Sequence, residues 1–318
     1  MSFLTGIKAN KAYRLQRNGN KEEALRLYEE CFAEGLDDPR YNLAYALLII
    51  RDGQYQKAKD FLVKHQKAPG MTQDQRTNLL VDYAVCCFRL GDLDKGINTL
   101  EQQFRKTETG ILYQTLGYLY VEKYDRANRP DFEAMKAAKA EADAASKDAE
   151  AGAAGAPEMA GEAAGTVKSE TEGAGTAVQG AEAAESTARE GTSPAEAAKE
   201  PPASPEEAWE AGKKKAEEFL EKAVDYDDED AICLDNMGQF LYRVKGDREA
   251  AKRYFEKALK IKDSQIDTLV FLSRYDEDAG DTRAALEKLE KALGGRFSPL
   301  NYWSKAQVEQ EIARLKGD

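Results

Sequence analysis

Small residues recur along this chain at intervals of 34, and that spacing limits the fold more than any other feature. Gly19 and Gly53 are 34 residues apart, and so are Ala24 and Ala58. The same interval separates three further pairs, which are Gly246 and Gly280, Ala251 and Ala285, and Ala258 and Ala292. A fixed period of roughly 20–50 residues is typical of folds that stack copies of one small unit.

Each unit is expected to be two helices joined at its glycine. A glycine at this place can adopt a left-handed backbone turn without the steric cost of a Cβ atom. An amphipathic stretch follows, with apolar or small residues at i, i+4 and i+7, which is one face of a helix. These triplets are Ala24, Tyr28 and Cys31; Ala58, Leu62 and His65; Ala216, Leu220 and Ala223; Ala251, Phe255 and Ala258; and Ala285, Leu289 and Ala292. The sequence therefore predicts an all-α array of helix pairs.

The residues at fixed places in the units carry a family resemblance. Tyr113-x2-Leu116-Gly117-x2-Tyr120 is a large apolar residue, then leucine and glycine, then an aromatic residue. The second halves of two units show an alanine followed by an aromatic residue, at Ala24-x3-Tyr28 and Ala251-x3-Phe255. This pattern resembles the tetratricopeptide repeat (TPR), a pair of antiparallel helices of about 34 residues. One departure is that the stretch from Leu241 to Gly246 is one residue longer than the pattern.

The resemblance implies an α-solenoid of about six TPR-like helix pairs. The units run roughly over residues 5–38, 39–76, 77–109, 110–229, 230–264 and 265–297. After Ser298-Pro299, a final helix to about Lys316 is expected to act as a capping helix, with Trp303, Val308, Ile312 and Leu315 on one side.

The fourth unit is interrupted by sequence of a different composition. Residues 131–205 contain 25 Ala and 8 Gly, no Leu, Ile, Trp or Tyr, and 15 acidic against 6 basic residues. Such a segment cannot bury enough apolar surface to offset its chain entropy, so we expect most of it to be disordered, with a marginal helix at Asp131–Ala151. The predicted division has three parts. Residues 1–126 hold units 1–3 and the first helix of unit 4, and residues 127–203 are a low-complexity acidic insert rich in Ala, Glu and Gly. Residues 204–318 hold the second helix of unit 4, units 5 and 6 and the capping helix.

The charge of the chain is concentrated in this insert. The formal net charge is −12, and residues 131–205 account for −9 of it. The repeats are therefore close to neutral. The insert is predicted to be a plain spacer, and the alternative is an acidic tether that attracts a basic partner or screens the molecule's own basic surface.

Composition also argues against several classes of function. The excess of acidic residues does not favour nucleic-acid binding, which needs a basic face. One histidine, His65, and the lack of nucleophile, dinucleotide, phosphate-loop or zinc-protease motifs predict a non-enzyme without metal or cofactor. The first 20 residues lack a signal-like pattern, no apolar run is long enough to span a bilayer, and the four cysteines show no CxxC spacing. We therefore expect a cytoplasmic protein that does not bind membranes.

The resemblance implies a concave groove lined by the first helix of each unit. The candidate groove residues are Tyr13, Arg17, Leu47, Arg51, Val85, Phe88, Arg89 and Tyr118, with Leu43, Val81 and Gln114 beside them. Arg17, Arg51 and Arg89 each lie two residues before a turn glycine, so they are expected to stack as a basic ladder. Such a ladder would favour a segment with apolar anchors and acidic groups, because arginine binds carboxylates bidentately. The alternative is that these arginines only solvate the ends of their helices.

The predicted function is therefore a non-catalytic interaction scaffold or adaptor that binds a peptide or helix of a protein partner in the groove. The alternatives are a self-assembling structural component and a regulatory subunit of a larger complex. The clamp that some members of the family use for a partner's terminal carboxylate is not expected, because Ala9, Tyr13, Val81 and Val85 stand at its places.

Overall fold

The computed structural model describes residues 3–153 and 204–317. Within these two stretches the chain forms 14 α-helices, one short 3₁₀ turn and one π-helical stretch, and no strand. The predicted all-α class is confirmed. The predicted disorder of the insert concerns residues 154–203 above all, and these lie outside the described residues.

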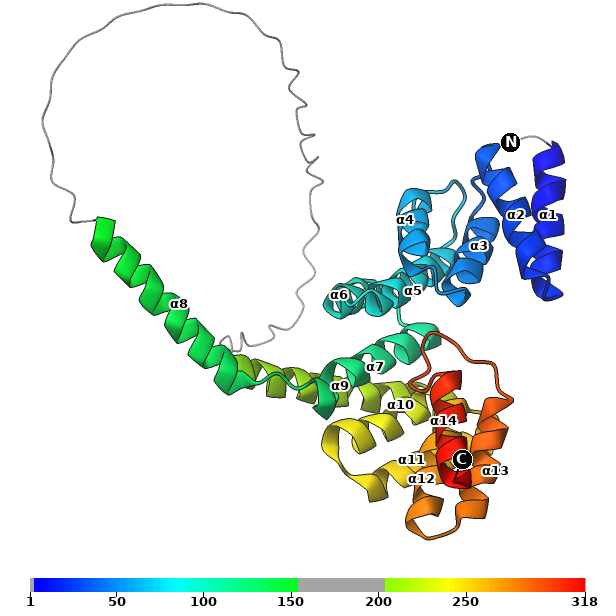
Figure 1. The fold of residues 1–318 in the computed structure, drawn as a ribbon. Helices are drawn as coiled ribbons and strands as arrows, with labels where there is room; N and C mark the ends of the chain where they lie inside the picture. The colour runs from blue at the N-terminus through cyan, green and yellow to red at the C-terminus, as the bar shows by residue number, and fades with distance from the viewer. Residues whose placement is uncertain (1–2, 154–203, 318) are drawn as a thin grey trace, which may run out of the picture. The chain divides into compact units, whose positions relative to one another are not determined.

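Helices that follow one another along the chain pack as pairs (Figure 1). The first three pairs are α1 (Phe3–Arg17) with α2 (Lys21–Ala33), α3 (Pro39–Arg51) with α4 (Tyr55–His65), and α5 (Gln73–Arg89) with α6 (Leu93–Phe104). Two later pairs are α10 (Ala231–Gln239) with α11 (Arg248–Ile261), and α12 (Ile266–Asp278) with α13 (Thr282–Leu293). The last helix, α14 (Lys305–Lys316), packs on α13.

The remaining pair joins helices that are far apart in the sequence, α7 (Gly110–Tyr124) and α9 (Pro205–Tyr226). The rings of Tyr124 and Trp209 meet edge to face with their centroids 5.1 Å apart. At Gly117 the helices are so close that an added Cβ would lie 3.0 Å from Leu220 Cδ2. With this pair the described residues form an α-solenoid of six helix pairs followed by a terminal helix.

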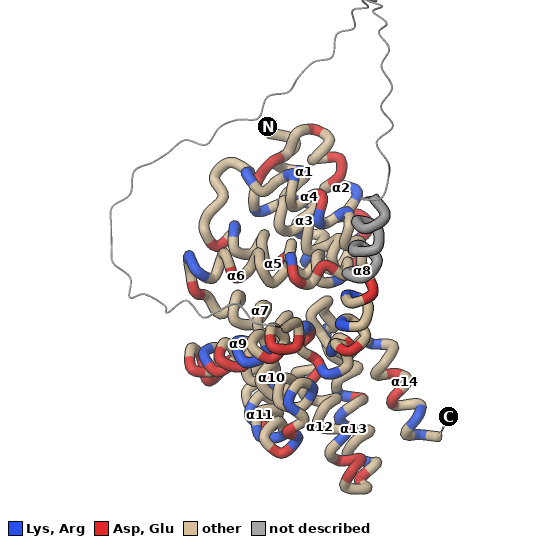
Figure 2. The backbone as a smooth tube through the Cα atoms, turned by 90° about the vertical axis from the view of Figure 1, so that its left-hand side faces the viewer, with Lys and Arg blue, Asp and Glu red and all other residues tan. Residues whose placement is uncertain are grey.

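The chain divides into two compact units, residues 1–129 with 207–318, and residues 130–206. The second unit contains α8 (Phe132–Ala153), which lies where the sequence predicts a marginal helix. The first unit contains all six pairs, and acidic and basic residues are interspersed over its helices (Figure 2). The domain boundaries at 126/127 and 203/204 stay predictions.

The turn glycines have the expected conformation. Gly19, Gly53, Gly91, Gly246 and Gly280 all have positive φ angles, between 76° and 84°. A side chain would be strained there, so glycine ends the first helix of each of these units.

The extra residue in the fifth unit has a structural consequence. Helix α10 continues as the π-helix η2 (Phe240–Lys245) before Gly246. A π turn adds one residue to a helix without ending it, and it is often found at functional sites. Arg243 lies in this stretch with its side chain buried.

No helix in the described part of the chain is long and apolar enough to cross a membrane. The four cysteines are free thiols and all are buried.

Candidate binding groove

The first helices of four pairs share one open pocket. We use the name open pocket for a cavity of about 660 Å³ lined by residues of α1, α3, α5 and α7, together with Arg296 from the loop after α13. Its apolar lining includes Tyr13, Leu43, Leu47 and Ile111. Leu43 and Leu47 point to the same side because they are four residues apart on α3.

Positive charge surrounds this apolar lining. Arg17, Arg40, Arg51 and Arg296 line the open pocket, and Asp82 is the one carboxylate among its lining residues. Burial lowers the pKa of Arg51, the nearby charge of Arg296 lowers it further, and Asp82 opposes the shift. Burial raises the pKa of Asp82 to about 7 although Arg51 favours its charged form. The open pocket is therefore both apolar and cationic.

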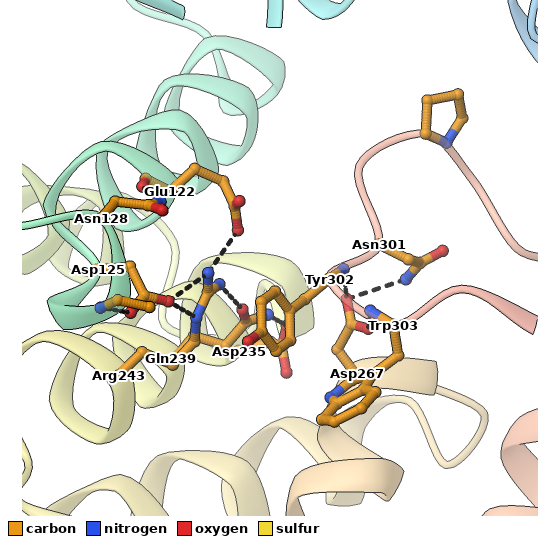
Figure 3. A network of polar contacts seen from close by, with 12 residues as sticks. Glu122, Asp125, Asn128, Asp235, Gln239, Arg243, Asp267, Asn301, Tyr302 and Trp303 are labelled. Carbon is orange, nitrogen blue, oxygen red and sulfur yellow. Dashed lines mark hydrogen bonds and ion pairs between the residues drawn. The ribbon is translucent and has the colours of Figure 1, made fainter. Parts of the chain in front are cut away.

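Next to the open pocket, the inner face is covered by the chain itself. We call residues Phe297–Ser304, between α13 and α14, the covering segment. Its backbone is held by Asp267, the second residue of α12. The amides of Tyr302 and Trp303 donate to the Asp267 carboxylate at 3.0 and 3.1 Å, and Asn301 Nδ2 donates to it at 3.0 Å (Figure 3).

The covering segment also contacts helices of the N-terminal half. Arg89 Nε donates to the carbonyl oxygen of Pro299 at 2.8 Å, and Arg89 Nη2 donates to the same oxygen. Leu300 packs against the apolar cluster of the first three pairs and against the central cluster around α7 and α9. The segment contains a turn at Pro299-Leu300, and it is held by backbone hydrogen bonds and an apolar anchor. A cavity of about 200 Å³, lined by Tyr118, Asp267 and Leu300 among others, remains beside it.

A buried ion-pair network supports the segment from α7 and η2 (Figure 3). The Arg243 side chain is 5% exposed and lies 2.7 Å from a carboxylate oxygen of Glu122 and 2.7 Å from one of Asp125. Its Nη1 donates to Gln239 Oε1 at 2.8 Å. The guanidinium lies over the ring of Tyr302, with Cζ 3.6 Å from the ring centroid. One charged group therefore joins α7, η2 and the covering segment.

A second buried carboxyl lies close to Asp267. Asp235 on α10 accepts hydrogen bonds from Thr268 Oγ1 at 2.5 Å and from Gln239 Nε2 at 2.8 Å. Burial, and then the neighbouring Asp267, raise the pKa of Asp235 to about 7. The pKa of Asp267 is also raised by burial, while its hydrogen bonds to the covering segment oppose the shift.

The raised pKa of Asp235 makes the free energy of unfolding depend on pH. The pKa of Asp235 is about 7 in the folded protein against an ordinary 3.8, so the folded protein holds a proton that the unfolded chain releases. The protonated Asp235 carboxyl therefore contributes to the free energy of unfolding in full below its ordinary pKa, and this contribution is lost as the pH rises through about 7. We expect the free energy of unfolding to increase from pH 8 to pH 5.5, by at most about 1.4 kcal/mol per pH unit for each proton. Urea unfolding of Asp235→Asn is expected to show a smaller increase, and an equal increase would contradict this assignment.

The structure places the eight predicted groove residues in three groups. Tyr13, Arg17, Leu47 and Arg51 line the open pocket. Arg89 binds the covering segment. The ring of Phe88 lies under the Arg89 guanidinium and packs edge to face on Tyr118. Val85 and Tyr118 are 5% and 3% exposed and belong to the two apolar clusters. Of the residues beside them, Leu43 and Val81 line the open pocket and Gln114 lines the small cavity. That these residues contact a partner stays a prediction.

Sequence reasoning missed the covering segment and the residues that hold it. The last helix is predicted to follow Ser298-Pro299 directly, but α14 begins at Lys305, after a capping box made by Ser304 and Gln307. The reason is that the amides of Tyr302 and Trp303 donate to Asp267 and so do not enter a helix. The sequence did carry one signal, because Asp235 and Asp267 are acidic residues next to apolar residues in the first turns of two first helices. In the described residues, no group of three or more potential ligands could hold a metal ion.

Comparisons with known proteins agree with the repeat. A family model described as tetratricopeptide repeat matches residues 235–265, and one described as anaphase-promoting complex, cyclosome, subunit 3 matches residues 16–103. The solved structure of TTC0263, a thermophilic TPR protein of Thermus thermophilus, covers 88% of this chain and 100% of its own at 13% identity, with a TM-score of 0.53. This chain is a tetratricopeptide repeat protein.

Two larger chains of known structure are also similar in fold. A chain of the APC/C hetero-tetramer Cut9–Hcn1 matches 96% of this chain and 41% of its own, at 12% identity and a TM-score of 0.52. The human IFIT1 dimer with m7Gppp-AAAA matches 96% of this chain and 53% of its own, at 13% identity and a TM-score of 0.53. No curated protein matches the sequence. At these identities the likeness concerns the fold alone, and a TPR fold is typical of non-catalytic protein-interaction scaffolds.

Proposed function

We propose that this TPR protein is a non-catalytic adaptor that binds an extended segment of a protein partner in the open pocket. The observation that carries the proposal is an apolar lining surrounded by four arginines on the first helices and the loop after α13. Leucine side chains there would contact an apolar anchor of the partner, and the arginines would pair with its acidic groups. The proposal includes a cytoplasmic location and no binding of nucleic acid or membrane.

The covering segment supports this proposal. Non-helical chain is held on the inner face there, with Asp267 accepting backbone amides and Leu300 packing on apolar clusters. The open pocket lies on the same face and has a corresponding apolar lining on α1 and α3. We infer that a partner segment uses the same kind of contacts there.

Panning a phage library of random dodecapeptides on the full chain tests the proposal. We expect enriched peptides to combine large apolar residues with acidic residues. Leu47→Glu removes an apolar contact and adds a carboxylate that repels the acidic groups of these peptides and competes for the same arginines, so it is expected to weaken their binding at least tenfold. Fluorescence anisotropy with synthetic copies of the enriched peptides measures the change.

The matched control is Val63→Glu, because Val63 is an exposed apolar residue of α4 that does not line the open pocket. Its affinity for the peptides is expected to stay unchanged. Enriched peptides that bind Leu47→Glu as tightly as the wild type, or no enrichment at all, would refute the pocket as the binding site.

A further inference from the structure

The open pocket holds more positive charge than the chain itself neutralises. Within the described residues, no ion pair joins Arg17, Arg51 or Arg296 to a carboxylate. By contrast, Arg243 and Arg248 are each paired with an acidic residue. The positive charge of the open pocket is thus not neutralised by ion pairs within the described residues.

Arg51 and Arg296 are the two arginines of the open pocket that are best placed to bind one anion together. They come from different elements, α3 and the loop after α13, yet line the same pocket and are near enough for Arg296 to lower the pKa of Arg51. Two like charges that line the same pocket repel each other, and an anion bound between them would relieve the repulsion. Asp82 neutralises them only in part, since its pKa of about 7 leaves much of it protonated at neutral pH.

We propose that Arg51 and Arg296 together bind the phosphate group of a phosphorylated side chain on the partner segment. A phosphorylated side chain carries about −1.5 to −2 charges at neutral pH and three strong acceptor oxygens, which suits two guanidinium groups. A carboxylate carries one charge, and it would leave the second arginine uncompensated. This inference rests on the proposed function and adds the chemistry of the group that the partner presents.

Three matched peptides test the inference by isothermal titration to the full chain. Each is acetyl-Gly-Leu-X-Leu-Gly-amide, where X is phosphoserine, glutamate or serine. We expect the phosphoserine peptide to bind at least tenfold more tightly than the glutamate peptide and the serine peptide to bind most weakly. Arg51→Gln and Arg296→Gln are each expected to weaken the phosphoserine peptide at least tenfold and to leave the serine peptide unchanged.

Arg283→Gln is the control, because the Arg283 side chain is 89% exposed and pairs with Glu287 within α13. It is expected to bind all three peptides as the wild type does, and circular dichroism checks that the variants are folded. Equal affinity for the phosphoserine and glutamate peptides would overturn phosphate recognition and leave the proposed function intact. No binding of the phosphoserine peptide, or no effect of Arg51→Gln and Arg296→Gln, would overturn the site, while the Leu47→Glu experiment decides the proposed function separately.

Discussion

Arg243→Ala is expected to lower the free energy of unfolding by about 3–5 kcal/mol, because it removes one member of a buried ion-pair network. Glu122 and Asp125 would then be buried near one another without the cation that lies 2.7 Å from each. The ring of Tyr302 would also lose the guanidinium that covers it. Urea unfolding followed by circular dichroism measures the change.

Arg248→Ala is the matched control, because Arg248 forms an ion pair with Asp278 in which both side chains are largely exposed. An exposed pair of this kind contributes about 0–1 kcal/mol. If Arg243→Ala were no less stable than Arg248→Ala, the network would not anchor the covering segment to α7 and η2. Arg243→Lys is expected to be intermediate, since lysine keeps the charge but cannot make the same set of planar contacts.

Asp267→Ala is expected to release the covering segment while α12 and α13 stay folded. The change removes the acceptor of three hydrogen bonds, from the Tyr302 and Trp303 amides and the Asn301 side chain. Losing these bonds is expected to lower the local opening free energy by about 2–4 kcal/mol. Hydrogen exchange of the Tyr302 and Trp303 amides should then accelerate by roughly 30- to 1,000-fold.

Asp263→Ala provides the comparison for this release. Asp263 precedes the same helix, is exposed, and pairs with Lys291 rather than with the covering segment. Exchange of the Tyr302 and Trp303 amides is expected to match the wild type in that variant. Unchanged exchange in Asp267→Ala would mean that Arg89 and Leu300 alone hold the segment in place.

The repeat itself could be predicted because its signals are local and periodic. Gly53 and Gly91 mark helix ends, since only glycine adopts their left-handed conformation without strain. Small residues mark close approaches, as at Gly238, where an added Cβ would lie 2.6 Å from the Phe255 ring. The one-residue excess between Leu241 and Gly246 was also visible, and its outcome is the π-helical stretch η2.

The candidate site could be predicted only in part. Arg17 and Arg51 were found because they share a repeat position and line the open pocket. Arg89 shares that position as well, but it binds Pro299, which is 210 residues away in the chain. Arg296 has no counterpart in the repeat pattern, so nothing in its spacing indicated that it joins Arg51.

The sequence by itself determined the all-α class, the six helix pairs and the turn glycines. These features depend on contacts within a unit or between neighbouring units. Such contacts use the same positions in each unit, so the 34-residue spacing of small residues indicates them. Only the tertiary structure decided that residues 297–304 cover part of the inner face and that the open pocket contains arginines from two distant elements. The physical reason is that Asp267, Arg89 and Arg243 hold the covering segment through its backbone and through a buried charge, and neither depends on a repeated sequence position.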